Sequence, residues 1–328
     1  MSKKRVLSGI QPTGKLHLGN LIGAINNWVK LQHEFDCFFF IADWHALTTA
    51  YEDTQNLRQN SREAALDLLA AGLDPKLCTL FVQSQVPEHA ELHLLLSMIT
   101  PLGWLERVPT YKSKIDELSS KDLGTYGFLG YPVLQAADIL MYQADFVPVG
   151  QDQVPHIELT REIGRRFNTV FKKEVFKEPL EKLTDVPVLP GLDGRKMSKS
   201  YGNTIALSEP VDSVRKKVVS MITDPSRARK DDPGHPEICA VYAYWKIIDP
   251  VHAKETEVLC RQGKIGCVQC KKDLADALVK YLEPIHARRH EILKDPHYLN
   301  TVLDDGAKKA RAEAMKMLET VKGAVGLL

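Results

Sequence analysis

The sequence predicts an α/β protein in which a doubly wound parallel sheet is followed by a helical C-terminal part. Up to about residue 205, short apolar runs alternate with longer segments in which apolar residues recur at helical spacing. From residue 211 onward only the helical pattern recurs. A chain of 328 residues with 44% hydrophobic content is long enough for roughly two domains. We therefore expect one domain over 1–205 and a second over 206–328.

Strands are predicted where a short apolar run is bounded by turn residues, at 6–10, 37–42, 79–83 and 146–149. Helices are predicted where apolar residues recur every three or four positions, at 18–29, 57–71, 88–99, 153–168, 214–222, 274–293 and 308–321. The stretch from about 88 to 130 breaks this alternation, which indicates an insertion. Ligands of such sheets bind beyond the carboxyl ends of the strands, so His17, His45 and Ser84 are candidate site residues.

The bulk composition restricts the possible partners. A net charge of +1 gives no overall basic field, so any contact with nucleic acid must come from local patches. The first five residues lead into a strand and not into a signal peptide, and no apolar run approaches the ~20 residues that span a membrane. We expect a cytoplasmic protein without membrane contact.

A strand, a turn and a helix follow one another near the N-terminus. The turn covers 11–14, and the helix opens on the motif His17-Leu18-Gly19-Asn20. A helix N-terminus offers unpaired N–H groups and the positive end of the helix dipole, which attract phosphate oxygens. Gly19 has no Cβ and lets a ligand approach the backbone, while His17 and Asn20 add side-chain donors. Alone, the pattern also fits an ordinary helix start with a surface histidine.

A second motif, Lys196-Met197-Ser198-Lys199-Ser200, follows a turn at 191–195. It delivers two ammonium groups and two hydroxyls on a flexible segment. Lysines that reach a leaving pyrophosphate only late in a reaction stabilise its transition state more than its ground state. A solvated basic loop is the other reading of such a stretch, and the full five-residue motif makes it the weaker one.

Together the two motifs resemble the paired signatures of class I aminoacyl-tRNA synthetases, which follow the first and the last strand of the catalytic domain. Within that class the chain is similar to the tryptophanyl-tRNA synthetases at 9–14, 43–46, 131–140, 150–153 and 156–161. The resemblance spans about 5 to 205. It implies a Rossmann-type catalytic domain, a homodimer interface on the insertion at about 88–130, and a helical anticodon-binding domain over 206–328. Trp104 and Leu105 either belong to that interface or cap the core.

The resemblance also implies a reaction. Tryptophan attacks ATP to give tryptophanyl-adenylate and pyrophosphate and is then transferred to tRNA(Trp), with Mg²⁺ on the phosphates and no side-chain nucleophile. The implied catalytic residues are His17, Asn20, Lys196 and Lys199. The implied ATP-binding residues are Gln11, Pro12, Thr13, Gly19, Asn20, Gly150, Gln151, Asp152, Val188, Lys196, Met197, Ser198, Lys199 and Ser200. Another phosphate lysine is implied in the insertion, either Lys112 or Lys114.

Three polar residues share one face of a helix that is predicted to begin at Tyr131. Tyr131, Gln135 and Asp138 are spaced four and three residues apart. A buried carboxylate among apolar neighbours needs a donor, and an indole N–H is a donor only. We expect Asp138 to accept from the tryptophan ring, unless its own helix backbone holds it.

Other substrate contacts follow from the resemblance alone. It places Tyr131, Gln135 and Gln153 around the substrate ammonium, His45 near the carboxylate and Leu7 against the indole. Tyrosyl-tRNA synthetases use the same spacing of tyrosine, glutamine and aspartate, so tyrosine is the alternative substrate. Those enzymes usually carry a tyrosine where this chain has Leu7. A paralogue that activates an amino acid without charging tRNA is a third interpretation, against which the helical C-terminal part argues.

Four of the six cysteines lie in the C-terminal part, namely Cys239, Cys260, Cys267 and Cys270. Clustered thiols in a cytosolic enzyme indicate a metal more than disulfides. Four thiolates hold either Zn²⁺ or an iron–sulfur cluster. Because only Cys267 and Cys270 form a close pair, the spacing favours a 4Fe–4S cluster, as in a subset of bacterial synthetases that this segment resembles. Zn²⁺ and four unligated cysteines are the alternatives.

Overall fold

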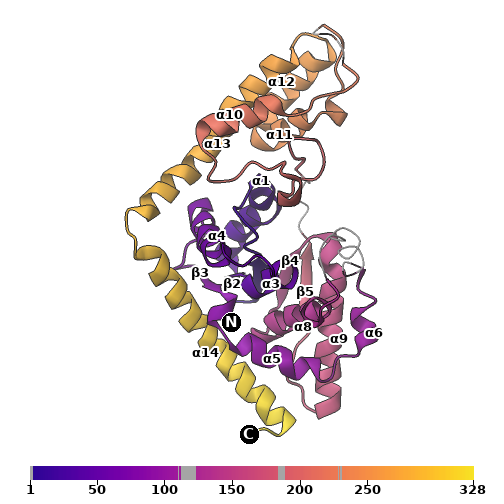
Figure 1. The fold of residues 1–328 in the computed structure, drawn as a ribbon, viewed down its shortest axis with the longest axis vertical. Helices are drawn as coiled ribbons and strands as arrows, with labels where there is room; N and C mark the ends of the chain where they lie inside the picture. The colour runs from indigo at the N-terminus through magenta and orange to yellow at the C-terminus, as the bar shows by residue number, and fades with distance from the viewer. Residues whose placement is uncertain (1–2, 110, 112–122, 184–188, 228, 230) are drawn as a thin grey trace.

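The computed structural model describes residues 3–109, 111, 123–183, 189–227, 229 and 231–328 (Figure 1). The strands in these residues are β1 (Arg5–Ile10), β2 (Asp36–Ile41), β3 (Cys78–Val82), β4 (Phe146–Val149) and β5 (Leu180–Leu183). They form a parallel sheet in the order β3-β2-β1-β4-β5. Three residues with predicted roles, Lys112, Lys114 and Val188, lie outside the described residues.

The sheet confirms the doubly wound arrangement. From β1 the chain moves outward to β2 and β3 and then returns to the other side of β1 with β4 and β5. The strand order therefore reverses beside β1, and ligands of such sheets bind at the carboxyl ends of the strands at this point. The four predicted strands are present within one residue of their expected bounds. The sequence did not predict β5, because this edge strand has only four residues and two of them are charged.

Two apolar cores flank the sheet. Alternate strand residues point to opposite faces, so Val6 and Phe39 belong to one core while Leu7 and Phe38 belong to the other. The described helical elements up to β5 are α1 (Leu18–Asn20), η1 (Leu21–Ile25), α2 (Asn26–Glu34), α3 (Asp43–Ala50), α4 (Leu57–Ala71), η2 (Gln83–Gln85), α5 (Glu88–Ser97), α6 (Leu102–Leu105), α8 (Tyr126–Met141), η3 (Gln151–Gln153) and α9 (Val154–Phe171). No described helix is both long enough and apolar enough to cross a bilayer.

The helix expected to begin at Tyr131 begins five residues earlier. In α8 the first helical residue is Tyr126, and the Thr125 hydroxyl caps the helix by accepting from the Phe128 N–H at 3.2 Å. Glycines and Pro132 within the helix weaken the periodic signal, which concealed this start. Gln135 and Asp138 still follow Tyr131 along the same helix.

The stretch predicted as an insertion contributes helices to one face of the sheet. Leu105 is 4% exposed and belongs to the core, and the Arg166 guanidinium lies 5.7 Å from the ring centre of Trp104. Trp104 and Leu105 of α6 therefore cap the core. Other apolar side chains of this region are exposed, namely Leu94, Met98, Leu102 and Tyr126.

The C-terminal part is helical, as predicted. Its elements after η4 (Lys199–Tyr201) are α10 (Val211–Ser220), η5 (Pro236–Ile238), α11 (Ala240–Ile248), α12 (Pro250–Arg261), α13 (Cys267–Leu293) and α14 (Tyr298–Val325). Figure 1 shows α10, α11 and α12 together at one end of the molecule, while α14 runs back along the body. Ala310 and Ala314 of α14 share a core with Phe81 of β3. The C-terminal part thus shares a core with the sheet, which a boundary near residue 205 does not anticipate.

Candidate active site

The His17 motif lies at the carboxyl end of β1, where the turn leads into α1. Its four residues form a capped helix start, because the Asn20 side-chain oxygen accepts from the His17 N–H at 3.1 Å and the His17 carbonyl accepts from the Asn20 N–H at 2.8 Å. His17 is 8% exposed, and its Nδ1 has no hydrogen-bond partner among the described residues. Burial, with a smaller effect of the Lys199 charge, lowers the pKa of His17 to about 4. The ring is therefore neutral near pH 7.

The second motif contacts the first. The Met197 sulfur accepts from the Gly19 N–H at 3.3 Å, and the Lys199 ammonium donates to the Gly14 carbonyl at 3.0 Å. The same ammonium lies 3.4 Å from the Thr13 hydroxyl. Burial lowers the pKa of Lys199 to about 8. Two segments almost 180 residues apart in sequence thus form one corner, as the predicted phosphate site requires.

Backbone pairing fixes the chain on the C-terminal side of this loop. Leu18 N donates to Ile205 O at 3.0 Å, and Leu207 N donates to Leu16 O at 2.8 Å. The segment that follows the lysine motif is therefore held against the start of α1. Any movement of the motif must occur before residue 205.

Sequence reasoning missed Asn203, which is 3% exposed and organises the loop. Its amide nitrogen donates to Asp193 at 2.7 Å and to the Lys196 carbonyl at 3.2 Å, while its oxygen accepts from Ser198 N at 2.8 Å. The side chain of Lys196 is exposed. A single amide residue inside a polar stretch gives no sequence signal for such a role.

A cavity of about 350 Å³ opens at the carboxyl ends of β1 and β4. Its volume falls within the usual range of small-molecule sites, about 300–1,000 Å³. All the residues predicted around tryptophan line it, namely Leu7, His45, Tyr131, Gln135, Asp138 and Gln153. So do three of the predicted ATP residues, namely Gln11, Asn20 and Gly150. The structure thus brings together side chains from β1, α3, α8 and η3.

Other predicted ATP-binding residues do not line this cavity. Pro12, Thr13 and Lys199 line a neighbouring cavity of about 560 Å³. Gln151 and Asp152 are exposed on η3, where Asp152 accepts from Gln153 Nε2 at 2.9 Å. A Cβ on Gly150 would lie 2.7 Å from the Asp152 carboxylate, so glycine permits this close approach. Ser200 lies within η4.

Asp138 is the most deeply buried charged group of the cavity, at 1% exposure. His45 Nε2 lies 2.7 Å from its Oδ2, while His89 Nδ1 lies 2.6 Å and Gln83 Nε2 lies 2.8 Å from its Oδ1. Burial alone would raise the pKa of Asp138, but the hydrogen bonds from His45 and His89 outweigh it and bring the pKa to about 2. Asp138 is therefore ionised, and donors from three other elements hold it, not its own helix backbone.

The contact between His45 and Asp138 differs from the expected placement of His45. The resemblance put His45 near the substrate carboxylate and Asp138 at the ring nitrogen, which are opposite ends of tryptophan. Because the His45 and Asp138 side chains are 2.7 Å apart, the two residues lie at the same end of the cavity. His45 lies on α3, directly after β2, and Asp138 lies on α8, directly before β4.

The sequence did not identify the donors behind Asp138. Gln83 and His89 are both fully buried, and the His89 Nε2 lies 2.7 Å from the Tyr142 hydroxyl. Ser84, which follows the predicted strand, does not line this cavity, and its N–H donates to Asp43 at 3.0 Å. The residue one position earlier, Gln83, is the one that reaches Asp138. The predicted strand extended one residue too far, to Gln83, which hid the position of this residue directly after β3.

The four C-terminal cysteines lie near one another. Burial, together with the charges of the other three thiols, raises the pKa of Cys270 to about 12. The Arg227 guanidinium lies 3.9 Å from the Cys260 sulfur and 3.8 Å from the Cys267 sulfur. Among the described residues, no three histidine, cysteine, aspartate or glutamate side chains are arranged as a metal site.

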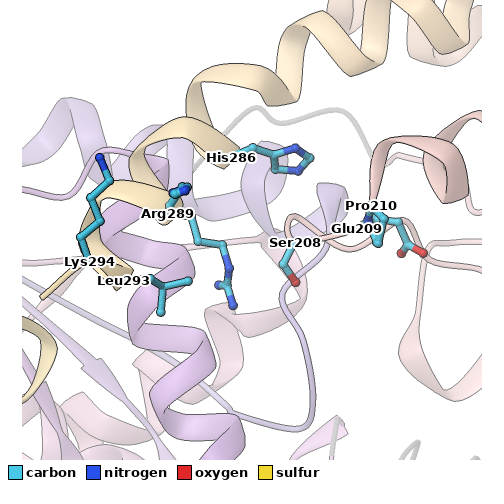
Figure 2. A pocket seen from close by; sticks show the side chains of 8 residues that line it. Ser208, Glu209, Pro210, His286, Arg289, Leu293 and Lys294 are labelled. Carbon is cyan, nitrogen blue, oxygen red and sulfur yellow. The ribbon is translucent and has the colours of Figure 1, made fainter. Parts of the chain in front are cut away.

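Another cavity, of about 420 Å³, lies between α13 and the segment 208–210 (Figure 2). Its lining residues are Ser208, Glu209, Pro210, His286, Arg289, His290, Leu293 and Lys294. Arg289 extends from α13 toward α4, where it forms ion pairs with Glu63 and with the fully buried Asp67. None of the predicted site residues lines this cavity.

Comparison with known proteins agrees with this geometry. Residues 2–283 match the family described as tRNA synthetases class I (W and Y). The chain is 53% identical to the tryptophan–tRNA ligase of Thermotoga maritima and 46% identical to that of Aquifex aeolicus, with 99% and 98% of the chain and 99% and 100% of the relatives covered. The structure of tryptophanyl-tRNA synthetase from Campylobacter jejuni, complexed with ADP and tryptophan, matches with a TM-score of 0.88 at 37% identity, covering 98% of this chain and 99% of that one. The chain belongs to the class I tRNA synthetases of the tryptophan and tyrosine group and, within it, to the tryptophan–tRNA ligases.

Proposed function

We propose that the chain activates L-tryptophan with ATP and transfers it to tRNA(Trp). The observation that carries this proposal is the position of the cavity. It is lined by the residues expected around tryptophan and lies at the strand ends beside the corner where His17, Gly19 and Lys199 meet. The match to tryptophan–tRNA ligases over nearly the whole chain supports the same substrates.

In the proposed reaction the tryptophan carboxylate oxygen attacks the α-phosphorus of ATP. A carboxylate–phosphorus bond forms, and the bond from the α-phosphorus to the bridging oxygen breaks, releasing pyrophosphate. Negative charge grows on the leaving group, where Lys196 and Lys199 stabilise it as ammonium ions. The neutral His17 ring and Asn20 donate hydrogen bonds to phosphate oxygens at the helix N-terminus. Mg²⁺ bound to the phosphates neutralises further charge.

The proposed tryptophan site uses both ends of the cavity. The ionised Asp138 accepts from the ring N–H, and the apolar Leu7 on β1 contacts the indole. Tyr131, Gln135 and Gln153 surround the substrate ammonium. A phenylalanine ring has no donor and would leave the Asp138 carboxylate without that bond, which lowers its affinity.

The test is ATP–pyrophosphate exchange with each amino acid, followed by charging of purified tRNA(Trp). We expect exchange with tryptophan and charging of tRNA(Trp). Exchange with tyrosine alone would favour a tyrosyl enzyme. Exchange with tryptophan but no charging of any tRNA would identify a paralogue that only activates the amino acid.

We further propose that Cys239, Cys260, Cys267 and Cys270 hold a 4Fe–4S cluster, with Zn²⁺ as the alternative. Four thiols lie within electrostatic reach of one another, and the charge of the nearby Arg227 guanidinium favours the thiolate form of Cys260, which supports a metal site with thiolate ligands. Protein purified without oxygen should be brown and contain about four iron and four sulfide ions per chain. Colourless protein with one zinc ion supports the alternative. Replacing Cys267 and Cys270 by serine should weaken tRNA charging and leave adenylate formation intact.

We also propose that the chain forms a homodimer through the insertion and contacts the anticodon through the helices of 206–328. The exposed Leu94, Met98, Leu102 and Tyr126 support an apolar interface there. Light scattering should give twice the chain mass. Met98→Glu, which places a charge on a residue that is 71% exposed, should shift the mass toward that of one chain.

A further inference from the structure

The two oxygens of Asp138 have different surroundings. Oδ1 is bound by His89 and Gln83, neither of which lines the cavity. Oδ2 is bound by His45, which does line it. A carboxylate oxygen accepts about two hydrogen bonds. His89 and Gln83, which lie outside the cavity, therefore occupy both acceptor positions of Oδ1, while one acceptor position remains free on Oδ2.

The hydrogen bonds behind Asp138 run in one direction. Because Asp138 is ionised, the His89 Nδ1 must donate to it, and a neutral imidazole then accepts at Nε2. Burial raises the pKa of Tyr142 well above its ordinary value, so its hydroxyl keeps its proton and donates to Nε2. This order, from Tyr142 through His89 to Asp138, fixes the tautomer of His89.

Aromatic rings enclose this chain of hydrogen bonds. The ring centre of His89 lies 5.4 Å from that of Tyr142, 6.1 Å from Phe81 and 6.2 Å from Phe40. His89, Tyr142 and Phe81 are fully buried. In surroundings with so few polar groups, each hydrogen bond is stronger than in water, and an unpaired one costs more.

We propose that His89 is a positioning residue for amino-acid selection. With Gln83 it occupies Oδ1 of Asp138 and holds the carboxylate so that the one remaining acceptor position, on Oδ2, faces the ring of the substrate. This proposal rests on the proposed function and deepens it. The pocket then offers an acceptor and no donor at this end, so it selects a ring that carries an N–H and rejects a ring of the same shape that lacks one.

The test compares tryptophan with β-(3-benzothienyl)-L-alanine, in which sulfur replaces the ring N–H. For each enzyme the ratio of the two kcat/KM values is measured by ATP–pyrophosphate exchange on the full chain. His89→Asn and His89→Gln form a matched pair. The asparagine amide reproduces the position of Nδ1 and can still donate to Asp138, whereas the glutamine amide lies near the position of Nε2.

We expect His89→Gln to lower the preference for tryptophan by about tenfold or more, through a raised KM for tryptophan, with kcat changed little. His89→Asn should keep the preference within about threefold of the parent. Equal loss in the two variants, or an unchanged preference in His89→Gln, would overturn the proposal. A purely structural role predicts equal loss, because both substitutions disturb the packing alike.

Tyr142→Phe is the second variant, because it keeps the ring and removes only the hydroxyl. The proposal expects a loss of preference smaller than that of His89→Gln, since His89 loses the partner that fixes its tautomer. If the preference is unchanged, the proposed order of protons is wrong. If the parent enzyme shows no exchange with tryptophan at all, the proposed function is wrong. This outcome differs from those that would contradict the proposed role of His89, which require an active parent enzyme.

Discussion

Replacing Gly306 by alanine should force α14 away from β3. An alanine Cβ at this position would lie 1.8 Å from the Leu80 carbonyl oxygen and 2.7 Å from its carbon. Carbon and carbonyl oxygen normally stay at least about 3.3 Å apart, so helix or strand must shift by roughly 1.5 Å. Because both contacting groups are backbone, no side-chain rotation relieves the clash.

The cost follows from the packing that such a shift disrupts. Ala310, Ala314 and Val321 on the same helix are fully buried against the sheet side of the core. Overpacking of a core costs about 1–3 kcal/mol where neighbours can adjust, so we expect about 3 kcal/mol here. The melting temperature should fall by about 6 °C or more.

Urea unfolding and thermal melts of the full chain measure this effect. Gly323→Ala is the matched control, because it lies on the same helix and a Cβ there has no neighbour within 4 Å. It should stabilise the protein by about 0.5–1 kcal/mol through helix propensity. If Gly306→Ala were as stable as the control, the close seating of α14 on the strand would be refuted.

Three further predictions concern charged groups. Lys199→Ala should slow ATP–pyrophosphate exchange by about 10²–10³-fold without raising the tryptophan KM, whereas Lys30→Ala, at an exposed position of α2, should change neither. Arg289→Met should lower the free energy of unfolding in urea by about 3 kcal/mol at pH 8, because it leaves the Asp67 carboxylate without its partner. Burial raises the pKa of Asp67 to about 6, so this carboxyl is protonated at pH 5 and the loss of stability should be smaller there. A loss that does not depend on pH would contradict this. The pKa of His17 falls from 6.5 to about 4 on folding. Between these pH values the folded state therefore binds fewer protons than the unfolded state, so the free energy of unfolding decreases as the pH drops from 6.5 to about 4. His17→Asn should remove that loss, and an unchanged slope of unfolding free energy against pH would show that His17 is not the cause.

The parts of the fold that sequence predicted are those with a repeating local signal. The helix at 57–71 was predicted with both ends, because its apolar residues recur at helical spacing and Gly72 ends it with a φ of +118°. The edge strand β5 and the helix α3 were not predicted. Neither has enough residues for a clear period, and both depend on pairing or packing with distant segments.

The residues of the candidate site likewise include some that the sequence could predict and some that it could not. His17 and Lys199 could be found because each sits in a motif of adjacent residues. Gln83, His89 and Tyr142 could not, since they come from three separate elements and meet only around Asp138. Without the fold, each is an ordinary polar residue near an apolar run. The sequence argument that a buried carboxylate needs a donor was correct in principle, but the protein itself supplies most of the donors.

The Met197 sulfur already accepts the Gly19 N–H that a phosphate oxygen would use. If phosphate binds at this amide, as the proposed function expects, nucleotide and thioether compete for it and ATP would displace Met197 as it enters. The free energy of that displacement is subtracted from the affinity for ATP. Met197→Ala should consequently bind ATP more tightly in a calorimetric titration, even though it removes an apolar contact; weaker binding would mean that Met197 supports the nucleotide and does not obstruct it.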